Sequence, residues 1–255
     1  CCSSLREEQI RTDKLDSCFP QRLTIVEFFL MKRAMSKLWL LDLDDTLFEA
    51  SAGMLYSIHL RMNEYIVKHL GVTDDEASDL RTRYWATYGA TFLGLWRHHG
   101  IEPTQFLSFA HDFDLAPFVR HDQHPACVLR QLSGKKVVFT NGPRNYAERI
   151  LRCLKLNSVI DGMVTSTDMK ALGEWRPKPS RLMLVQTCRR FGVAPCHATL
   201  VDDSVMNLKC AHEVGLRTVW CTGYRQRHGK LANRYALPFI DHSITHIREL
   251  PFLKR

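Results

Sequence analysis

The chain has 255 residues, 45% of them hydrophobic and 24% charged, which excludes a wholly disordered polypeptide and allows a large core with a smaller second domain. Its 35 Lys and Arg exceed 27 Asp and Glu, and the net charge of +8 favours an anionic partner, either a phosphorylated metabolite or nucleic acid. No run approaches the roughly 18 apolar residues of a membrane span, and the nine cysteines form no C-x-x-C pair, so we expect a cytoplasmic protein with reduced thiols and no membrane partner.

Residues 1–34 are predicted to be an N-terminal extension outside the fold. The apolar periodicity of this segment is weak, and the chain begins at Cys1 rather than at a methionine. Met31 and Met35 come shortly before the first strong strand pattern. We therefore expect a poorly ordered leader or an over-extended reading frame, with a helix packed on the surface as the alternative.

From Lys37 onward, short apolar runs alternate with longer helical patterns. These runs are apolar on both sides, which is typical of parallel strands covered by helices on both faces. The pattern predicts an α/β fold with a doubly wound, mainly parallel, Rossmann-like sheet in residues 35–50 and 126–255. The expected strands are 38–41, 137–139, 199–201 and 217–220, and the expected helices are 146–156, 180–191 and 205–214.

Residues 51–125 interrupt this alternation with an insertion that we expect to be entirely helical. Apolar side chains recur there at three- and four-residue steps, as on one face of a helix. The positions that show this spacing are Leu55, Ile58, Met62, Ile66 and Leu70, and the stretches around Tyr84-Trp85 and Phe106–Phe109 have a similar pattern.

The first strand runs directly into an acidic segment that contains Asp42 and Asp44. Carboxylates two residues apart at a strand end can point to the same side, where their repulsion calls for a cation, a shared proton or solvent. An ordinary acidic turn would explain the segment equally well. The interpretation as a site therefore depends on what the later strands supply.

Three later segments supply the groups that phosphate chemistry requires. Thr140 follows the second strand, with Asn141 and Gly142, and offers a hydroxyl and backbone N–H groups. Lys178 precedes a predicted helix, whose N-terminus also favours anions. Asp202-Asp203 follows a third strand and adds oxygen ligands of the kind that Mg²⁺ prefers. Ligands of open parallel sheets bind outside the carboxyl ends of the strands, so we expect one site.

This order of motifs resembles the haloacid dehalogenase (HAD) superfamily of Mg²⁺-dependent phosphohydrolases, from about Lys37 to the C-terminus, with 51–125 in the place of its small helical cap. The resemblance implies that Asp42 is a nucleophile that becomes phosphorylated and that Asp44 is the general acid and base. The implied catalytic residues are Asp42, Asp44, Thr140 and Lys178, and the implied substrate-binding residues are Thr140, Asn141, Arg144 and Lys178. The implied Mg²⁺ ligands are Asp42, Asp44 through its carbonyl, Asp202 and Asp203, the last directly or through water.

Two residues, Asn207 and Asp44, narrow what that resemblance implies about the metal ligands and the substrate. Asn207 stands where many relatives have an acidic residue, and we expect it to orient the aspartates rather than to bind metal. Asp44 indicates a phosphate ester as substrate, because a leaving alkoxide needs a proton and a halide does not.

The amino-acid sequences of these motifs are similar to those of the pyrimidine 5′-nucleotidase branch. This similarity implies a small phosphorylated metabolite such as UMP or CMP as substrate. A sugar-phosphate phosphatase or a phosphomutase is the alternative. A binding module without turnover is disfavoured, because a site that no longer catalyses a reaction has no physical reason to keep so much uncompensated charge together.

Candidate nucleoside contacts have structural alternatives. Arg144 is equally consistent with a solvated loop charge, and the aromatic residues at helical spacing are better explained as core of the insertion. These candidates are Tyr56, His59, Tyr84, Trp85, Tyr88, Trp175 and Arg176.

Several histidines, one Cys-His pair and the basic residues near the C-terminus are better explained as structural or surface residues than as binding sites. The histidines at 98–99, 121 and 124 lack the pattern of a zinc site, and Cys196-His197 is expected to point to opposite faces of a strand. The basic residues at 225–234 and 254–255 are read as solvated surface rather than a nucleic-acid site.

Overall fold

The computed structural model describes residues 37–119, 125–224 and 237–253, all within one compact unit, Ser36–Arg255. The predicted N-terminal extension lies outside the described residues, as do the histidines at 121 and 124 and the basic segments 225–234 and 254–255.

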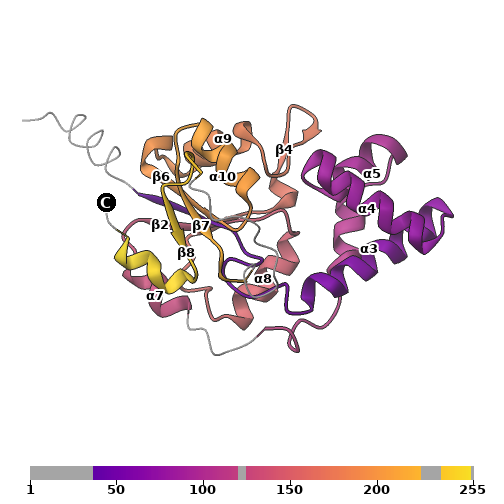
Figure 1. Ribbon diagram of the computed structural model, residues 1–255, viewed down its shortest axis with the longest axis horizontal. Coiled ribbons are helices and arrows are strands. Elements are labelled where there is room, and N and C mark those ends of the chain that lie inside the picture. Colours follow the sequence, from indigo (N-terminus) through magenta and orange to yellow (C-terminus); the bar gives the residue numbers. More distant parts are fainter. Residues whose placement is uncertain (1–36, 120–124, 225–236, 254–255) are drawn as a thin grey trace, which may run out of the picture. The chain divides into compact units, whose positions relative to one another are not determined.

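A six-stranded sheet forms the centre of this unit, and every neighbouring pair of strands is parallel (Figure 1). The strand order is β3-β2-β1-β6-β7-β8, so the first strand lies in the interior. The strands are β1 (Leu38–Leu41), β2 (Lys135–Phe139), β3 (Gly162–Val164), β6 (Ala198–Asp202), β7 (Arg217–Cys221) and β8 (His242–Ile244). The predicted doubly wound α/β fold is confirmed.

The inner strands carry apolar side chains on both of their faces because helices cover both faces of the sheet. Leu41 and Val201 belong to one buried cluster, and Leu40 and Leu200 belong to the other. Helix α8 (Arg144–Cys153), α7 (Pro125–Gln131) and the 3₁₀ helix η3 (Ile247–Phe252) contribute to the first cluster. Helices α9 (Arg181–Phe191) and α10 (Val205–Glu213) contribute to the second.

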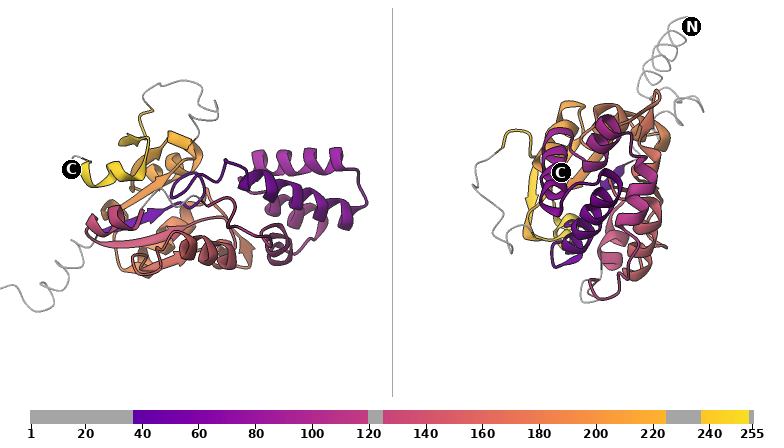
Figure 2. Two further views of the ribbon diagram at one scale, coloured as in Figure 1. Left: turned by 90° about the horizontal axis from the view of Figure 1, so that it is seen from below. Right: turned by 90° about the vertical axis from the view of Figure 1, so that its right-hand side faces the viewer.

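Four helices lie between β1 and α7, and they group together in Figure 2. They share a third buried cluster, to which Trp175 also belongs. A capping box between Thr73 and Glu76 begins the second of them, and glycines with positive φ end the first three. They are α3 (Met54–Leu70), α4 (Asp74–Tyr88), α5 (Thr91–His99) and α6 (Pro103–Ala110). The division into a cap of residues 51–125 and a core of 35–50 and 126–255 stays a prediction.

Short elements complete the part of the chain that the structure describes. An antiparallel pair, β4 (Lys170–Ala171) with β5 (Glu174–Trp175), precedes α9, and the 3₁₀ helices η1 (Ser166–Asp168) and η2 (Pro195–His197) flank this region. Among the described residues, none of the helices is long and apolar enough to cross a membrane. The six cysteines in the described ranges are unpaired thiols.

Helix α8 forms hydrogen bonds with the segment that follows α6. The Arg149 guanidinium donates to the backbone carbonyls of His111, at 3.3 Å, and of Phe113. The His111 ring is buried, and its Nδ1 lies 2.7 Å from the Leu107 carbonyl oxygen. Burial lowers the pKa of His111 to about 4, because the charged ring would lose its hydration, although the Leu107 contact opposes this shift.

The buried imidazole of His111 predicts a loss of stability in mild acid. Its folded-state pKa lies below the ordinary value of 6.5, so the unfolded chain takes up a proton first as the pH falls. The contribution of His111 to the free energy of unfolding should therefore decrease below pH 6.5, with most of the loss between 6.5 and 4. This group alone should remove about 2 kcal/mol between roughly pH 7 and pH 5.

Urea unfolding of wild type and His111→Asn at both pH values measures this effect. Relative to the wild type, the variant should be more stable at pH 5 than at pH 7 by about the contribution of His111, because the carboxyl groups titrate alike in both proteins. In contrast, His212→Asn, at an exposed position, should follow the wild type. Equal losses in wild type and His111→Asn would contradict the assignment.

Candidate active site

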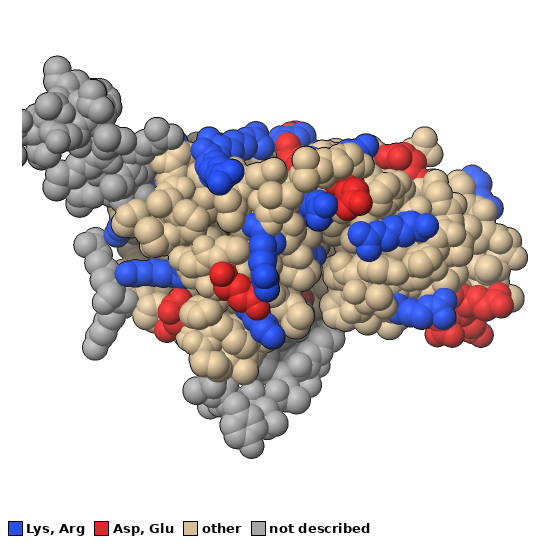
Figure 3. Space-filling view, turned by 90° about the horizontal axis from the view of Figure 1, so that it is seen from above, with Lys and Arg blue, Asp and Glu red and all other residues tan. Residues whose placement is uncertain are grey.

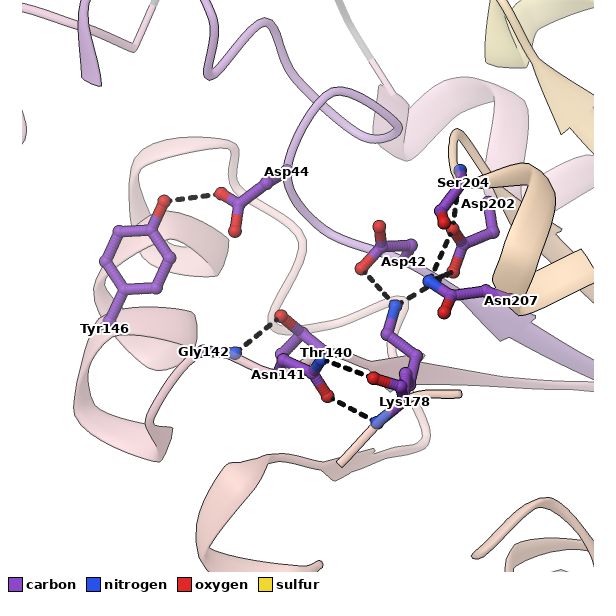
Figure 4. A network of polar contacts seen from close by, with 10 residues as sticks. All are labelled: Asp42, Asp44, Thr140, Asn141, Gly142, Tyr146, Lys178, Asp202, Ser204 and Asn207. Carbon is purple, nitrogen blue, oxygen red and sulfur yellow. Dashed lines mark hydrogen bonds and ion pairs between the residues drawn. The ribbon is translucent and has the colours of Figure 1, made fainter. Parts of the chain in front are cut away.

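The carboxyl ends of three adjacent strands bring the predicted residues together. Asp42 follows β1, Thr140 follows β2, and Asp202 ends β6. Because β1 lies between β2 and β6, these three side chains meet at one edge of the sheet. Lys178 reaches them from the loop before α9 (Figure 4).

Lys178 bridges two of these carboxylates. Its Nζ lies 2.7 Å from Asp42 Oδ1 and 2.8 Å from Asp202 Oδ2. The Lys178 side chain is 4% exposed, and that of Asp202 is fully buried. A buried cation between two anions is a charge-assisted contact that holds all three groups in place.

Lys178 and the neighbouring carboxylates affect each other's pKa values. Burial raises the pKa of Asp42, as do the neighbouring carboxylates Asp202 and Asp203, while Lys178 opposes the rise. Burial by itself would lower the pKa of Lys178, but the charges of Asp202 and Asp42 outweigh it, so the pKa is raised and the ammonium group stays protonated.

Asn141 fixes the backbone of Lys178. Its amide Nδ2 donates to the Lys178 carbonyl at 3.1 Å, and its Oδ1 accepts from the Lys178 N–H at 2.8 Å. The neighbouring Thr140 hydroxyl is buried and accepts from the Gly142 N–H at 3.0 Å. The loop after β2 therefore sets the position of the lysine, which the sequence did not reveal. Substrate binding by Asn141 stays a prediction.

Asp202 is oriented by the beginning of α10. Its Oδ1 accepts from the Ser204 N–H at 2.8 Å and from the Asn207 amide at 2.9 Å. The same amide lies 3.1 Å from Oδ2. Asn207 thus makes the orienting contact that we expected of it.

The carboxylates of Asp42, Asp202 and Asp203 can approach a common point. One oxygen from each lies within 4.8 Å of the others, and all three residues are buried. Carboxylate oxygens suit a hard divalent cation, so this donor set fits Mg²⁺. The predicted ligand role of Asp44 through its backbone carbonyl stays a prediction.

The side chain of Asp44 turns away from this cluster (Figure 4). Its Oδ1 accepts a hydrogen bond from the Tyr146 hydroxyl, with an oxygen-to-oxygen distance of 2.5 Å. Burial raises the pKa of Asp44 to about 7, and the Tyr146 hydrogen bond opposes the rise. The sequence did not indicate a role for Tyr146, because its position on the buried face of α8 is that of an ordinary core residue.

Other predicted substrate contacts are engaged with protein groups. The Arg144 guanidinium donates to both oxygens of Asp168, at 3.1 and 2.8 Å. Trp175 is buried with its ring against Phe92, and Arg176 donates to Glu174. Their predicted contacts with substrate stay predictions.

The aromatic residues of α4 differ in exposure. Tyr84 is buried, and its hydroxyl lies 2.7 Å from His99 Nε2, as expected of a core residue in these helices. Tyr88 makes a similar contact of 2.6 Å with His98 Nε2. Trp85 is 59% exposed and Tyr56, on α3, is 67% exposed, so these two are accessible to a ligand.

Cys196 and His197 lie far from this edge of the sheet. They belong to η2, a short 3₁₀ helix, so the expectation that they sit on a strand is wrong. Both line a cavity of about 310 Å³ at the amino ends of the strands, together with Lys37 and Arg217. The carboxylate cluster occupies the opposite ends.

Several curated proteins align with part of the chain, among them the following two. "Phosphate metabolism protein 8" from Saccharomyces cerevisiae is 25% identical over 191 residues, covering 71% of this chain and 60% of that protein. "Validoxylamine A 7′-phosphate phosphatase" from Streptomyces hygroscopicus subsp. limoneus is 29% identical over 104 residues, covering 40% of this chain and 45% of that protein. The chain thus spans less than two thirds of the length of either relative.

Solved structures share the fold. A HAD phosphatase from Thermococcus onnurineus superposes with a TM-score of 0.56 at 21% identity, covering 85% of this chain and 96% of that one. A 2-haloacid dehalogenase from Pseudomonas syringae superposes with a TM-score of 0.52 at 20% identity, covering 86% and 97%. These structures show the fold alone.

The family model of the haloacid dehalogenase-like hydrolases matches residues 37–215. This match includes all three strand ends that carry Asp42, Thr140 and Asp202, together with the loop of Lys178. The chain belongs to the haloacid dehalogenase-like hydrolase family.

Proposed function

We propose that this chain is a Mg²⁺-dependent phosphomonoesterase that works through a phosphorylated aspartate. One observation carries the proposal: Lys178 is buried between Asp42 and Asp202 at the carboxyl ends of parallel strands. Burying like charges is costly, so this cluster fits a site that a cation and an anionic substrate complete.

In the proposed reaction, a carboxylate oxygen of Asp42 attacks the phosphorus of the ester. The bond between phosphorus and the ester oxygen breaks, and Asp44 gives its proton to the departing oxygen. Asp44 then takes a proton from water, whose oxygen attacks phosphorus, and the bond to Asp42 breaks to release phosphate. Two easier displacements replace one difficult hydrolysis.

Lys178 and Thr140 would hold the phosphoryl oxygens during both displacements. The ammonium group of Lys178 is fixed before substrate arrives, because Asn141 binds its backbone and two carboxylates bind its Nζ. Fixed charges of this kind stabilise a transition state without reorganisation at the moment of reaction.

Asp42, Asp202, Asp203 and the backbone carbonyl of Asp44 would hold Mg²⁺. The bound ion would offset the negative charge of the transferring phosphoryl group. Support comes from the buried carboxylate oxygens within 4.8 Å of one another.

Asp44 favours phosphate esters over haloacids as substrates. Both a phosphatase and a dehalogenase share this fold, so the fold does not decide between them. A departing alkoxide needs a proton, which a carboxyl with its pKa raised to about 7 can supply near neutral pH.

For the substrate, we propose pyrimidine nucleoside 5′-monophosphates such as UMP and CMP. The support is the similarity of residues 39–48, 140–142 and 201–207 to the pyrimidine 5′-nucleotidase branch. A phosphatase of another small ester is the second candidate, which the relative named for validoxylamine A 7′-phosphate favours.

On the face that Figure 3 shows, Lys and Arg side chains are dispersed among Asp and Glu.

A panel of UMP, CMP, AMP and hexose phosphates tests both levels of this proposal. Phosphate release should require Mg²⁺, be abolished by a chelator, and be fastest with UMP or CMP. A preference for hexose phosphates would overturn the nucleotide assignment but leave the phosphatase assignment standing. No release from any ester in the presence of Mg²⁺ would overturn the phosphatase assignment itself.

A further inference from the structure

Tyr146 places a buried hydroxyl against Asp44. Its Oη lies 2.5 Å from Asp44 Oδ1 and 3.1 Å from Met54 Sδ, at the beginning of α3. Tyr146 comes from the first turn of α8, the helix that follows the Thr140 loop. The hydroxyl therefore meets Asp44 at the junction of the β1 loop, α3 and α8.

The tyrosine ring has little freedom to move. It is 0% exposed, and the His111 ring packs against it with centroids 4.8 Å apart. On another side Gly142 is so close that a Cβ there would lie 3.0 Å from Tyr146 Cδ1. A ring confined in this way carries its hydroxyl to a fixed point.

The helix that carries Tyr146 is itself tied down. Its next turn contributes Arg149, which donates to the carbonyls of His111 and Phe113 on the chain returning from α6. Ala147, Ile150 and Leu151 are buried against the sheet. The position of the Tyr146 hydroxyl is thus set by the core and does not depend on a surface loop.

The Tyr146 hydroxyl binds one carboxylate oxygen of Asp44, and the other carboxylate oxygen stays available for proton transfer. A short hydrogen bond from a phenol to a carboxyl group restricts rotation about the terminal side-chain bond. With Oδ1 bound to Tyr146, Oδ2 is the atom that can exchange a proton with a reacting oxygen. Figure 4 shows Tyr146 and Asp44 paired apart from the Lys178 cluster.

We propose that Tyr146 is a positioning residue that orients Asp44 for proton transfer. The inference rests on the proposed function, in which Asp44 protonates the leaving oxygen. Because Tyr146 is fully buried, it acts through Asp44 and does not bind substrate. Small errors in the placement of a reacting group are costly in rate, so loss of the hydroxyl should lower kcat/KM for esters whose leaving oxygen needs a proton.

Tyr146→Phe removes the hydroxyl and keeps the ring. For the best alkyl ester of the substrate panel, kcat/KM should fall by about 10- to 100-fold, a part of what a general acid contributes to the first displacement. For p-nitrophenyl phosphate, kcat/KM should change less than about 3-fold, because it reports only the transfer to Asp42, in which the stable phenolate departs without a proton. A merely structural role would lower both rates alike.

Two controls isolate the hydroxyl. Tyr65→Phe alters a buried tyrosine that packs on His69 within α3 and should affect neither ester. Met54→Leu removes the sulfur contact while leaving the Asp44 contact, and it should retain the wild-type ratio of the two rates.

The outcomes separate the two proposals. A larger loss with the alkyl ester than with the aryl ester supports the positioning role. Equal losses with the two esters, or no loss with the alkyl ester, would overturn the positioning role. The proposed function would still stand in that case, because the wild type releases phosphate. A wild type that hydrolyses neither ester with Mg²⁺ present would overturn the proposed function and this inference with it.

Discussion

Asp42→Asn is expected to lower phosphate release by about 10⁴-fold or more, because an amide oxygen is too weak a nucleophile to form the phosphorylated intermediate. The substitution keeps the size of the side chain. It also leaves Lys178 paired with Asp202 at 2.8 Å, so one cation still faces one anion. The fold should therefore persist, and steady-state release of phosphate from the best ester of the panel measures the effect.

The stability of this variant distinguishes a lost nucleophile from a lost fold. Burial and two neighbouring carboxylates oppose ionisation of Asp42, so its neutral replacement should unfold at the same urea concentration as the wild type or a higher one. Asp75→Asn, an exposed change in the first turn of α4, should keep wild-type turnover. Substantial turnover by Asp42→Asn would contradict the nucleophile assignment.

Lys178→Met is expected to be among the most destabilising single substitutions in this chain. It leaves Asp42 and Asp202 buried without the cation that now lies between them, next to Asp203. Removing one partner of a buried ion pair typically costs about 3 to 5 kcal/mol. Urea unfolding without divalent cations should show a loss of this size, and addition of Mg²⁺ should restore part of it.

A double-mutant cycle tests the cause of that loss. Asp42→Asn combined with Lys178→Met removes a negative charge together with the positive one, so the double variant should be more stable than Lys178→Met alone. Lys135→Met serves as the matched control, since its ammonium group is exposed and bonds to the Phe191 carbonyl. A double variant less stable than Lys178→Met would contradict the electrostatic explanation.

Much of the fold and of the residue set could be predicted because the relevant rules are local. The apolar runs 38–41 and 199–201 read directly as buried strands, and the helix predicted at 205–214 is observed at Val205–Glu213. Polar residues at the ends of parallel strands share one edge of the sheet, which explains why Asp42, Thr140 and Asp202 meet. The short outer strands β3 and β8 were not predicted, since three residues carry too little pattern.

Partners distant in sequence could not be predicted. Tyr146 reads as one apolar position of an amphipathic helix, and nothing near it indicates that its hydroxyl meets Asp44, 102 positions away. Arg144 looks like a free cation until the fold brings Asp168 to it. Tyr84 and Trp85 are adjacent in one helix, yet one is 8% and the other 59% exposed, a difference that depends on how the helices pack.

The interior place of β1 also bears on how the molecule assembles. β1 pairs with β2 only after the chain has passed through residues 42–134, and with β6 only after a longer excursion. Pairings so remote in sequence predict slow folding. The entropy of closing a loop nevertheless grows slowly, by about 0.6 kcal/mol for each doubling of its length. The connection between β1 and β2 could thus lengthen or shorten during evolution with little penalty to the sheet that carries Asp42.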